Sequence, residues 1–431
     1  MWVATALLIA TYGVIMSERV NRAIVALIGA GLMVVLGVLN QAAAVRGVDF
    51  NTIALLTGMM IIVAITRKCG VFQYIAIWSA KKVKANPAGI MFMLQIVTAV
   101  VSAFLDNVTT VLLVIPVTLV ITEELGVRPW PFLISQIFAS NIGGTATLIG
   151  DPPNILIGSQ VGLTFNDFIL NLAPIVIVIQ VAASLIFHVM WGRKMHATAE
   201  ARERVMRFNA RDAITDFVLL RKSMIVLAGV ILSFVMAHNL GLEPGTIGLL
   251  GAAVLMLLHV FGRKAEDQAH ETHSIFGEVE WITIFFFVGL FIVVYGVETA
   301  GLLKLLAQEL VAATHGDLTL TTIAILWASA ILSAIVDNIP FVATMIPLIK
   351  NMAPTFGGPE GLLPLWWALS LGACLGGNGT LIGASANLTV AGIAERAGHP
   401  IRFVPYMKVG FGIMLVTIAI ATVYIDWRYL P

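Results

Sequence analysis

The feature that most constrains this chain is an Asp-Asn step that occurs twice, each time in the middle of a long apolar run. The two runs, 102–116 and 333–347, share one pattern: Ser-Ala precedes the step, and a proline follows ten residues after the aspartate. An ionisable side chain at membrane depth is costly and marks a candidate functional site. The two steps are Asp106-Asn107 and Asp337-Asn338.

Composition places these runs in a membrane. The 431 residues are 59% hydrophobic and 11% charged, with a mean hydropathy of +0.96, whereas a soluble domain carries about 25% charged residues. We therefore expect an all-α polytopic protein of the cell inner (plasma) membrane. The net charge of +1 argues against a nucleic-acid partner. Two distant cysteines, Cys69 and Cys374, indicate neither a disulfide framework nor a zinc site.

Apolar segments of spanning length predict about ten membrane spans. They lie near 1–16, 21–40, 50–66, 130–159, 171–192, 222–238, 246–262, 281–297, 364–394 and 404–426, and two of them, 130–159 and 364–394, are interrupted. The Asp-Asn steps divide two further apolar stretches, 88–122 and 320–353. Each arm of these stretches is about 15 residues long, which is short for a full crossing. We therefore expect two re-entrant hairpins, with two full crossings each as the alternative.

The distribution of basic residues predicts the orientation. With ten spans and both termini outside, 21 of the 25 Lys and Arg residues fall in inside loops and 4 fall outside. Reading either hairpin as two full spans leaves this sidedness unchanged. The same assignment puts every Lys and Arg in a loop, so no basic side chain is expected at membrane depth.

The chain repeats itself. The first Asp-Asn step, with Thr52, Gly58 and Gly70, recurs at an offset of 231, and the segment 143–154 recurs as 376–387 at an offset of 233. Each half has five spans, an odd number, so the second half is expected to be inverted in the membrane. Inverted repeats are typical of secondary transporters, whose sites lie near the midplane at discontinuous helices. The predicted parts are 1–192, the first repeat; 193–221, a cytoplasmic linker; and 222–431, the second repeat.

Three aspartates are expected at membrane depth: Asp106, Asp151 and Asp337. Without a basic neighbour, each must be protonated, be paired with a bound cation or face water. These are therefore the candidate proton-coupling residues. The alternative is that each Asp-Asn step only caps the second helix of its hairpin.

The interruption at 140–154 reads Ser-Asn-Ile-Gly-Gly-Thr-Ala-Thr-Leu-Ile-Gly-Asp-Pro-Pro-Asn. Glycines release the backbone from helical geometry, and prolines cannot continue the hydrogen-bond ladder. Unwound carbonyls and polar side chains would then offer oxygen ligands. The second copy has Ala384 where the first has Asp151, so the two half-sites are not equivalent. We expect no catalytic or metal site, and the candidate substrate- or ion-binding residues are Asp106, Asn107, Thr109, Thr110, Asn141, Gly143, Gly144, Thr145, Thr147, Asp151, Asn154, Asp337, Asn338, Gly377, Asn378, Thr380 and Asn387.

The motifs at 106–110 and 140–154 resemble those of the ArsB/NhaD permeases of the ion transporter superfamily. This group contains arsenite permeases, NhaD-type sodium/proton antiporters and P protein relatives. The resemblance implies a transporter and not an enzyme. It also implies a scaffold domain and a transport domain built from both halves, hairpin tips that meet the interrupted helices, elevator-like movement, and a possible homodimer. An arsenite-delivering ATPase subunit is a further possible partner.

The resemblance leaves three functions open. The first is proton-coupled efflux of arsenite or antimonite, and the alternative is NhaD-type sodium/proton antiport. Sodium-coupled uptake of an anion or dicarboxylate is the third, and it is weakened because related dicarboxylate carriers have Ser-Asn-Thr where this chain has Asp-Asn-Val-Thr at 106–109. No cofactor is expected, since a proton or sodium gradient would drive transport.

Overall fold

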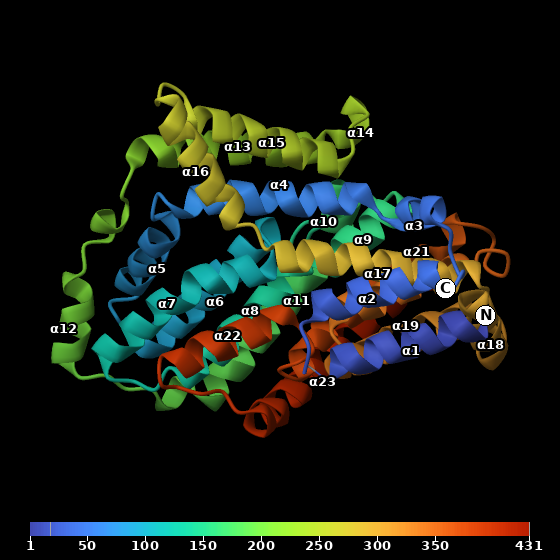
Figure 1. Ribbon diagram of the computed structural model, residues 1–431. Coiled ribbons are helices and arrows are strands. Elements are labelled where there is room, and N and C mark those ends of the chain that lie inside the picture. The colour runs from blue at the N-terminus through green and yellow to red at the C-terminus, as the bar shows by residue number, and fades with distance from the viewer. Residues whose placement is uncertain (18, 431) are drawn as a thin grey trace.

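In the computed structural model, the described residues 1–17 and 19–430 contain helices and connecting segments but no strand (Figure 1). Many of the long helices run roughly along one direction. Eight of the helices are long and apolar enough to cross a membrane, which agrees with a polytopic membrane protein. They are α4 (Phe50–Arg67), α6 (Pro87–Phe104), α7 (Asn107–Leu125), α11 (Ala173–Met190), α13 (Phe217–Val235), α17 (Trp281–Thr299), α19 (Leu318–Ile335) and α23 (Phe403–Tyr429).

Two tightly packed helix pairs organise what we call the first helix group. α4 packs along α15 (Pro244–Val260), and α2 (Arg22–Val35) packs along α17. An added Cβ on Gly58 would lie 2.4 Å from the Gly248 carbonyl carbon, and one on Gly289 would lie 2.5 Å from that of Ala26. Both pairs therefore need glycine at the crossing. α1 (Trp2–Met16) and α13 flank these pairs and complete the group.

The two Asp-Asn steps form the tips of two helical hairpins. α6 and α7 meet at Asp106, and α19 meets α20 (Asn338–Lys350) at Asp337. Figure 1 shows α7 extending toward the end of the molecule where α12 lies, while α18 lies at the other end, near α19. The arms contain 18, 19, 18 and 13 residues. The sequence estimate of short arms was therefore wrong for three of the four.

The two interrupted helices lie against these hairpins and form, with them, the second helix group. α8 (Trp130–Gly144) and α9 (Pro152–Val161) flank the first break, and α21 (Leu363–Gly376) and α22 (Ser385–Arg396) flank the second. α6 packs along α8 and α19 along α21, with α11 and α23 beside them. Every residue from Phe132 to Gly158 is buried, so the predicted interruptions lie inside the protein.

Several helices were not anticipated from hydropathy, because they are short or carry many polar residues. They are α3 (Gln41–Gly47), α5 (Val71–Lys82), α10 (Phe165–Asn171), α12 (Ala199–Arg207), α14 (Ala237–Leu240), α16 (Ala265–Gly277) and α18 (Leu302–Ala313). α12 belongs to the predicted linker 193–221, which is bound to the first half. Arg204 Nε donates to Glu124 at 3.2 Å, and Lys81 Nζ donates to the Phe208 carbonyl at 2.7 Å.

Candidate functional site

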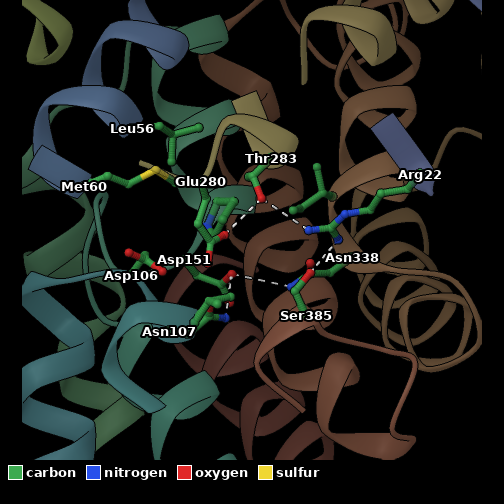
Figure 2. Close-up of a pocket in the computed structure, with 13 residues that line it drawn as sticks. Arg22, Leu56, Met60, Asp106, Asn107, Asp151, Glu280, Thr283, Asn338 and Ser385 are labelled. Carbon is green, nitrogen blue, oxygen red and sulfur yellow. Dashed lines mark hydrogen bonds between the residues drawn. The ribbon is translucent and has the colours of Figure 1, made fainter. Parts of the chain in front are cut away.

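A small central cavity lies where the hairpin tips, the α8–α9 break and the first helix group meet (Figure 2). Its lining includes Asp106, Asp151, Glu280, Asn107 and Asn338. The cavity has a volume of about 20 Å³, which is room for about one water molecule. The predicted meeting of both hairpin tips with the first interrupted helix is therefore seen in the structure.

Asp151 is the most deeply placed of these acids. It is 0% exposed, and its Oδ1 accepts from Asn107 Nδ2 at 3.2 Å and from Asn338 Nδ2 at 3.5 Å. The two hairpins thus each supply one amide to the same carboxylate oxygen. Within the described residues, no group meets hydrogen-bond geometry with Asp151 Oδ2, and the neutral thiol of Cys374 lies beside this carboxyl. A buried carboxylate with one free oxygen is suited to hold a proton or a small cation.

A chain of buried carboxamides extends from Asp151 into the second half. Asn107 Nδ2 also donates to Asn141 Oδ1 at 3.1 Å. Asn141 Nδ2 then donates to Asn378 Oδ1 at 3.0 Å and to Asn387 Oδ1 at 2.9 Å. Four of the predicted binding residues therefore form one network joining the two breaks.

The unwound carbonyls predicted as ion ligands are occupied by asparagine side chains. Asn154 Nδ2 donates to the Thr145 and Thr147 carbonyls at 3.1 and 2.9 Å. In the second half, Asn387 Nδ2 donates to the Gly377 and Thr380 carbonyls at 2.7 and 2.8 Å. These contacts stabilise the broken backbone and use one lone pair of each of these four carbonyl oxygens.

The threonine hydroxyls of the breaks hold the hairpins in place. Thr147 Oγ1 donates to the Ala103 carbonyl, and Thr380 Oγ1 donates to the Ala334 carbonyl, each at 2.5 Å. Thr145 Oγ1 donates to the Asn141 carbonyl at 2.7 Å. The Thr147 and Thr380 contacts hold α6 and α19 against the interrupted helices, whereas the Thr145 contact stays within the end of α8.

The predicted glycines allow neighbouring backbone segments to pack closely. A Cβ on Gly143 would lie 2.2 Å from the Ala99 carbonyl oxygen, and one on Gly144 would lie 2.5 Å from that of Gly150. A Cβ on Gly377 would lie 2.9 Å from the Gly383 carbonyl oxygen. Gly143 and Gly144 are the last two residues of α8, so the helix ends at this glycine pair and the break begins at Thr145.

Asp106 caps its hairpin helix and also lines the cavity. Its Oδ1 accepts from the Thr109 amide at 2.8 Å, and its Oδ2 accepts from the Thr109 hydroxyl at 2.5 Å. Asp106 therefore caps its helix, as the alternative expects, and also lies at the cavity, as a functional role requires. Thr110 is buried one residue further on, and in the described part of the chain its hydroxyl has no partner.

Asp337 is paired with a basic residue that the sequence analysis placed in a loop. Arg22 NH1 donates to Asp337 Oδ2 at 2.8 Å and to Ser385 Oγ at 2.6 Å, and NH2 donates to Thr283 Oγ1 at 3.4 Å. The guanidinium also lies 5.0 Å from the centre of the Phe286 ring. The expectation of no basic side chain at the site was wrong, because the long side chain of Arg22 reaches inward from the first turn of α2.

Glu280 is a site residue that the sequence analysis assigned to an inside loop. It precedes α17, accepts from Thr283 Oγ1 at 3.2 Å, and lines the central cavity. The repeat could have identified Glu280, since an acid, Asp49, lies 231 residues earlier and precedes the equivalent helix α4. Asp49 likewise accepts from the hydroxyl of its third neighbour, Thr52, at 2.8 Å.

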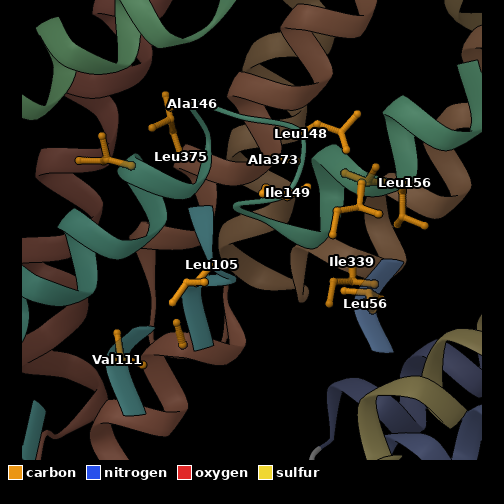
Figure 3. Close-up of a cluster of buried hydrophobic side chains, with 14 of the residues drawn as sticks. Leu56, Leu105, Val111, Ala146, Leu148, Ile149, Leu156, Ile339, Ala373 and Leu375 are labelled. Carbon is orange, nitrogen blue, oxygen red and sulfur yellow. The ribbon is translucent and has the colours of Figure 1, made fainter. Parts of the chain in front are cut away.

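A second, larger cavity lies on the side of the site away from Glu280. It has a volume of about 250 Å³ and is lined by residues that include Asp49, Glu298 and Lys350. Figure 3 shows Leu56 and Ile339, which line the central cavity, close to Leu156, which lines the larger one. We expect these three apolar side chains to form a barrier between the two cavities, since Leu56 and Ile339 line one and Leu156 lines the other.

Comparison with known proteins gives the family context. Residues 12–372 match the family model described as citrate transporter (CitMHS). An uncharacterised transporter of Mycobacterium tuberculosis H37Rv is 43% identical, over 99% of this chain and 98% of that protein. The 46 kDa membrane protein of Mycobacterium leprae is 40% identical, over 99% of each chain.

Two more distant proteins extend the comparison. The P protein of Homo sapiens is 33% identical over 98% of this chain and 59% of its own length. The structure of the YdaH transporter of Alcanivorax borkumensis is similar with a TM-score of 0.59, covering 88% of this chain and 87% of that one at 13% identity. That last likeness concerns the fold. Together the matches confirm the superfamily expected from the motifs, and none of the matched names specifies arsenite.

Proposed function

This chain belongs to the citrate transporter (CitMHS) family of secondary transporters, and we propose that it exchanges protons for a small cation such as Na⁺ across the membrane. The single observation that carries this proposal is the buried Asp151. Its Oδ1 receives amides from both hairpin tips, while its Oδ2 is free of partners among the described residues. A proton and Na⁺ would compete for that oxygen, and competition at one site is what exchange requires.

The charge balance around the cavity supports a cation. Asp106, Asp151 and Glu280 line it, Asp337 lies beside it, and Arg22, which pairs with Asp337, is the basic residue in the described lining. Four carboxylates against one guanidinium repel an anion when they are ionised. A tricarboxylate such as citrate would meet this repulsion in a cavity with room for about one water molecule.

The exchange would proceed through neutralisation. With a proton on Asp151, the carboxyl carries no charge and tolerates its apolar surroundings. When the proton leaves, Oδ2 becomes a hard anionic oxygen, the kind of ligand that Na⁺ prefers, and Asn107 and Asn338 hold the other oxygen in place. The Asp151 carboxyl can therefore hold either a proton or Na⁺. Burying it as a bare carboxylate, with neither ion bound, costs free energy.

Arsenite or antimonite efflux is the second candidate. Its support is the set of neutral polar side chains in the lining, which includes Asn107, Asn338, Thr283 and Ser385. Such side chains can form hydrogen bonds with an uncharged hydroxide. Cys374 is a poor arsenic ligand in this arrangement, because its thiol is buried and its Sγ lies 3.6 Å from Asn154 Oδ1.

The membrane arrangement follows the same proposal. We place 1–192 and 222–431 as inverted repeats of five spans each, with 193–221 as the cytoplasmic linker, both termini outside and both hairpins re-entrant. The first helix group would be the scaffold and the second the moving part. The constant offset of 231 residues and the matching Gly58 and Gly289 crossings support this division.

Proteoliposomes test the proposed substrate. Vesicles loaded at acidic pH with a pH-sensitive dye receive external Na⁺, arsenite or citrate in separate experiments. Exchange predicts that Na⁺ alkalinises the lumen, that citrate does not, and that Asp151→Asn removes the response while the exposed control Asp426→Asn keeps it. Arsenite uptake or efflux driven by the pH gradient without any Na⁺ response would replace the cation proposal with the second candidate.

A further inference from the structure

Arg22 joins the two helix groups across the central cavity. It lies in the first turn of α2, in the first group. Its shortest contacts, at 2.8 Å to Asp337 and 2.6 Å to Ser385, are with the tip of the second hairpin and the start of α22, both in the second group. Any sliding of one group past the other must break these contacts.

The contact is sheltered and specific. The side chain of Arg22 is 26% exposed and that of Asp337 is 13% exposed, so water screens the pair only partly. Ser385 Oγ donates to the same Asp337 oxygen at 3.2 Å, and the guanidinium lies over the Phe286 ring. Hydrogen bonds between two ionised groups are about twice as strong as those between neutral ones.

The repeat contains no second copy of this bridge. Ala26 of α2 and Gly248 of α15 occupy equivalent places at the two glycine crossings, 222 residues apart. At the same offset, Arg22 corresponds to Pro244, which has no charge. The carboxylate of Asp106, the counterpart of Asp337, instead accepts from Thr109 of its own helix. The bridge therefore stabilises one arrangement of the two groups and has no equivalent for the opposite one.

We propose that Arg22 is a lock that holds the empty carrier in the arrangement described here. The ionised Asp337 binds Arg22 when no cation is present. A cation that enters the central cavity, which both Asp151 and Arg22 line, displaces the guanidinium from Asp337 and frees the second group to move. The other charged groups facing this pair are Glu280 of α17, Asp106 of the first hairpin and Asp151 of the break. A carrier with no ion bound would stay in this arrangement. The transporter would therefore exchange one ion for another, and would not let a single ion move alone down its gradient. Only the identity of the ion rests on the proposed function.

The test measures the distance between the groups directly. Spin labels are attached at Val35, which ends α2 and is 79% exposed, and at Asn351, which follows α20 and is exposed. Both native cysteines are buried. The paired variant Arg22→Gln with Asp337→Asn removes the lock without leaving an unpaired buried charge. Its matched control is Arg19→Gln, which removes the same charge from an exposed position three residues earlier.

In Na⁺-free buffer we expect the wild type and Arg19→Gln to share one main distance. The paired variant should populate a second distance about tenfold more. An unchanged distance distribution in the paired variant would overturn the lock. Adding Na⁺ to the wild type should produce the same second distance; a paired variant that shifts while Na⁺ leaves the wild type unmoved would support the lock and refute Na⁺ as the ion.

Discussion

Two aspartates of the same charge have opposite surroundings in this protein. Asp337 is neutralised by Arg22, whereas Asp151 receives the amides of Asn107 and Asn338 and has no basic partner among the described residues. A paired carboxylate keeps its charge when buried, but an unpaired one must take up a proton or a cation. We therefore assign ion exchange to Asp151 and control of movement to Asp337. Sequence symmetry alone made the pair Asp106 and Asp337 look equivalent.

The first residue-scale prediction concerns Asp151. Asp151→Asn keeps the shape of the side chain and lets Asn107 and Asn338 still donate, so the protein should fold and reach the membrane. Exchange should fall at least about 100-fold, because the group that carries the proton is lost. Dye-loaded proteoliposomes measure the rate, and size-exclusion chromatography checks the fold. Exchange near the wild-type rate would remove Asp151 from the mechanism.

The second residue-scale prediction concerns Glu271, an acid on α16 that lies outside the membrane spans. The Lys68 ammonium and then His259 hold the pKa of Glu271 at about 2, below the ordinary value of 4.5. Since this pKa is lowered on folding, the stabilising contact is fully present above about pH 4.5 and is lost as pH falls toward 2.

Glu271→Gln should therefore lower the thermal midpoint at pH 7 by about 2 °C. The difference from the wild type should shrink as the pH is lowered from 4.5 toward 2. Glu266→Gln, an exposed change on the same helix, is the control and should leave the midpoint unchanged. Thermal unfolding followed by intrinsic fluorescence measures both, and equal midpoints for Glu271→Gln and wild type at pH 7 would contradict the assignment.

At the scale of the elements, hydropathy and motif spacing predicted the two hairpin tips, the two breaks and five of the eight helices of spanning length. The other three such helices are hairpin arms. These features depend on local sequence: apolar length, glycines, prolines and a capping aspartate. The amphipathic helices α5, α16 and α18 were missed, because each is short and carries polar residues. Arg22 and Glu280 were missed for another reason: loop assignment by charge ignores how far a side chain reaches from a helix start.

Helix crossing gives the first prediction at this scale. Gly58→Ala places a Cβ against the Gly248 backbone and should separate α4 from α15, at a cost of about 1–3 kcal/mol. Gly31→Ala is the matched control, since nothing lies within 4 Å of its added Cβ. A thermal shift assay in detergent compares the two, and equal stability would contradict the close crossing.

The expected apolar barrier of Leu56, Ile339 and Leu156 gives the second prediction at this scale. Leu156 is fully buried, and Leu156→Ala removes side-chain volume between the central cavity and the larger one. Apolar constrictions exclude ions by staying dry, so we expect a higher proton leak in proteoliposomes without added Na⁺. The change should also cost about 3 kcal/mol of stability. A leak no greater than that of wild type would place the barrier elsewhere.

At the scale of the whole molecule, the repeated elements account for how the transporter could move. The positions that differ between the repeats account for where it would bind an ion. Symmetry supplies two hairpins, two breaks and two glycine crossings, a plan suited to moving one helix group past another. In our proposal the exceptions supply direction and selectivity: Asp151 corresponds to Ala384 in the second half, and Arg22 corresponds to Pro244. The repeat and the replacement of Asp151 by Ala384 could be predicted from the sequence. The role of Arg22 needed the structure, because its contact with Asp337 joins residues 315 positions apart.

The most direct test of the central claim is proton release on cation binding by the purified protein. Na⁺ is added to the transporter in weakly buffered detergent solution, and the pH change is recorded. Competition at Asp151 predicts that Na⁺ releases protons from the wild type and none from Asp151→Asn. Binding of Na⁺ without proton release, or equal release from the variant, would contradict the account.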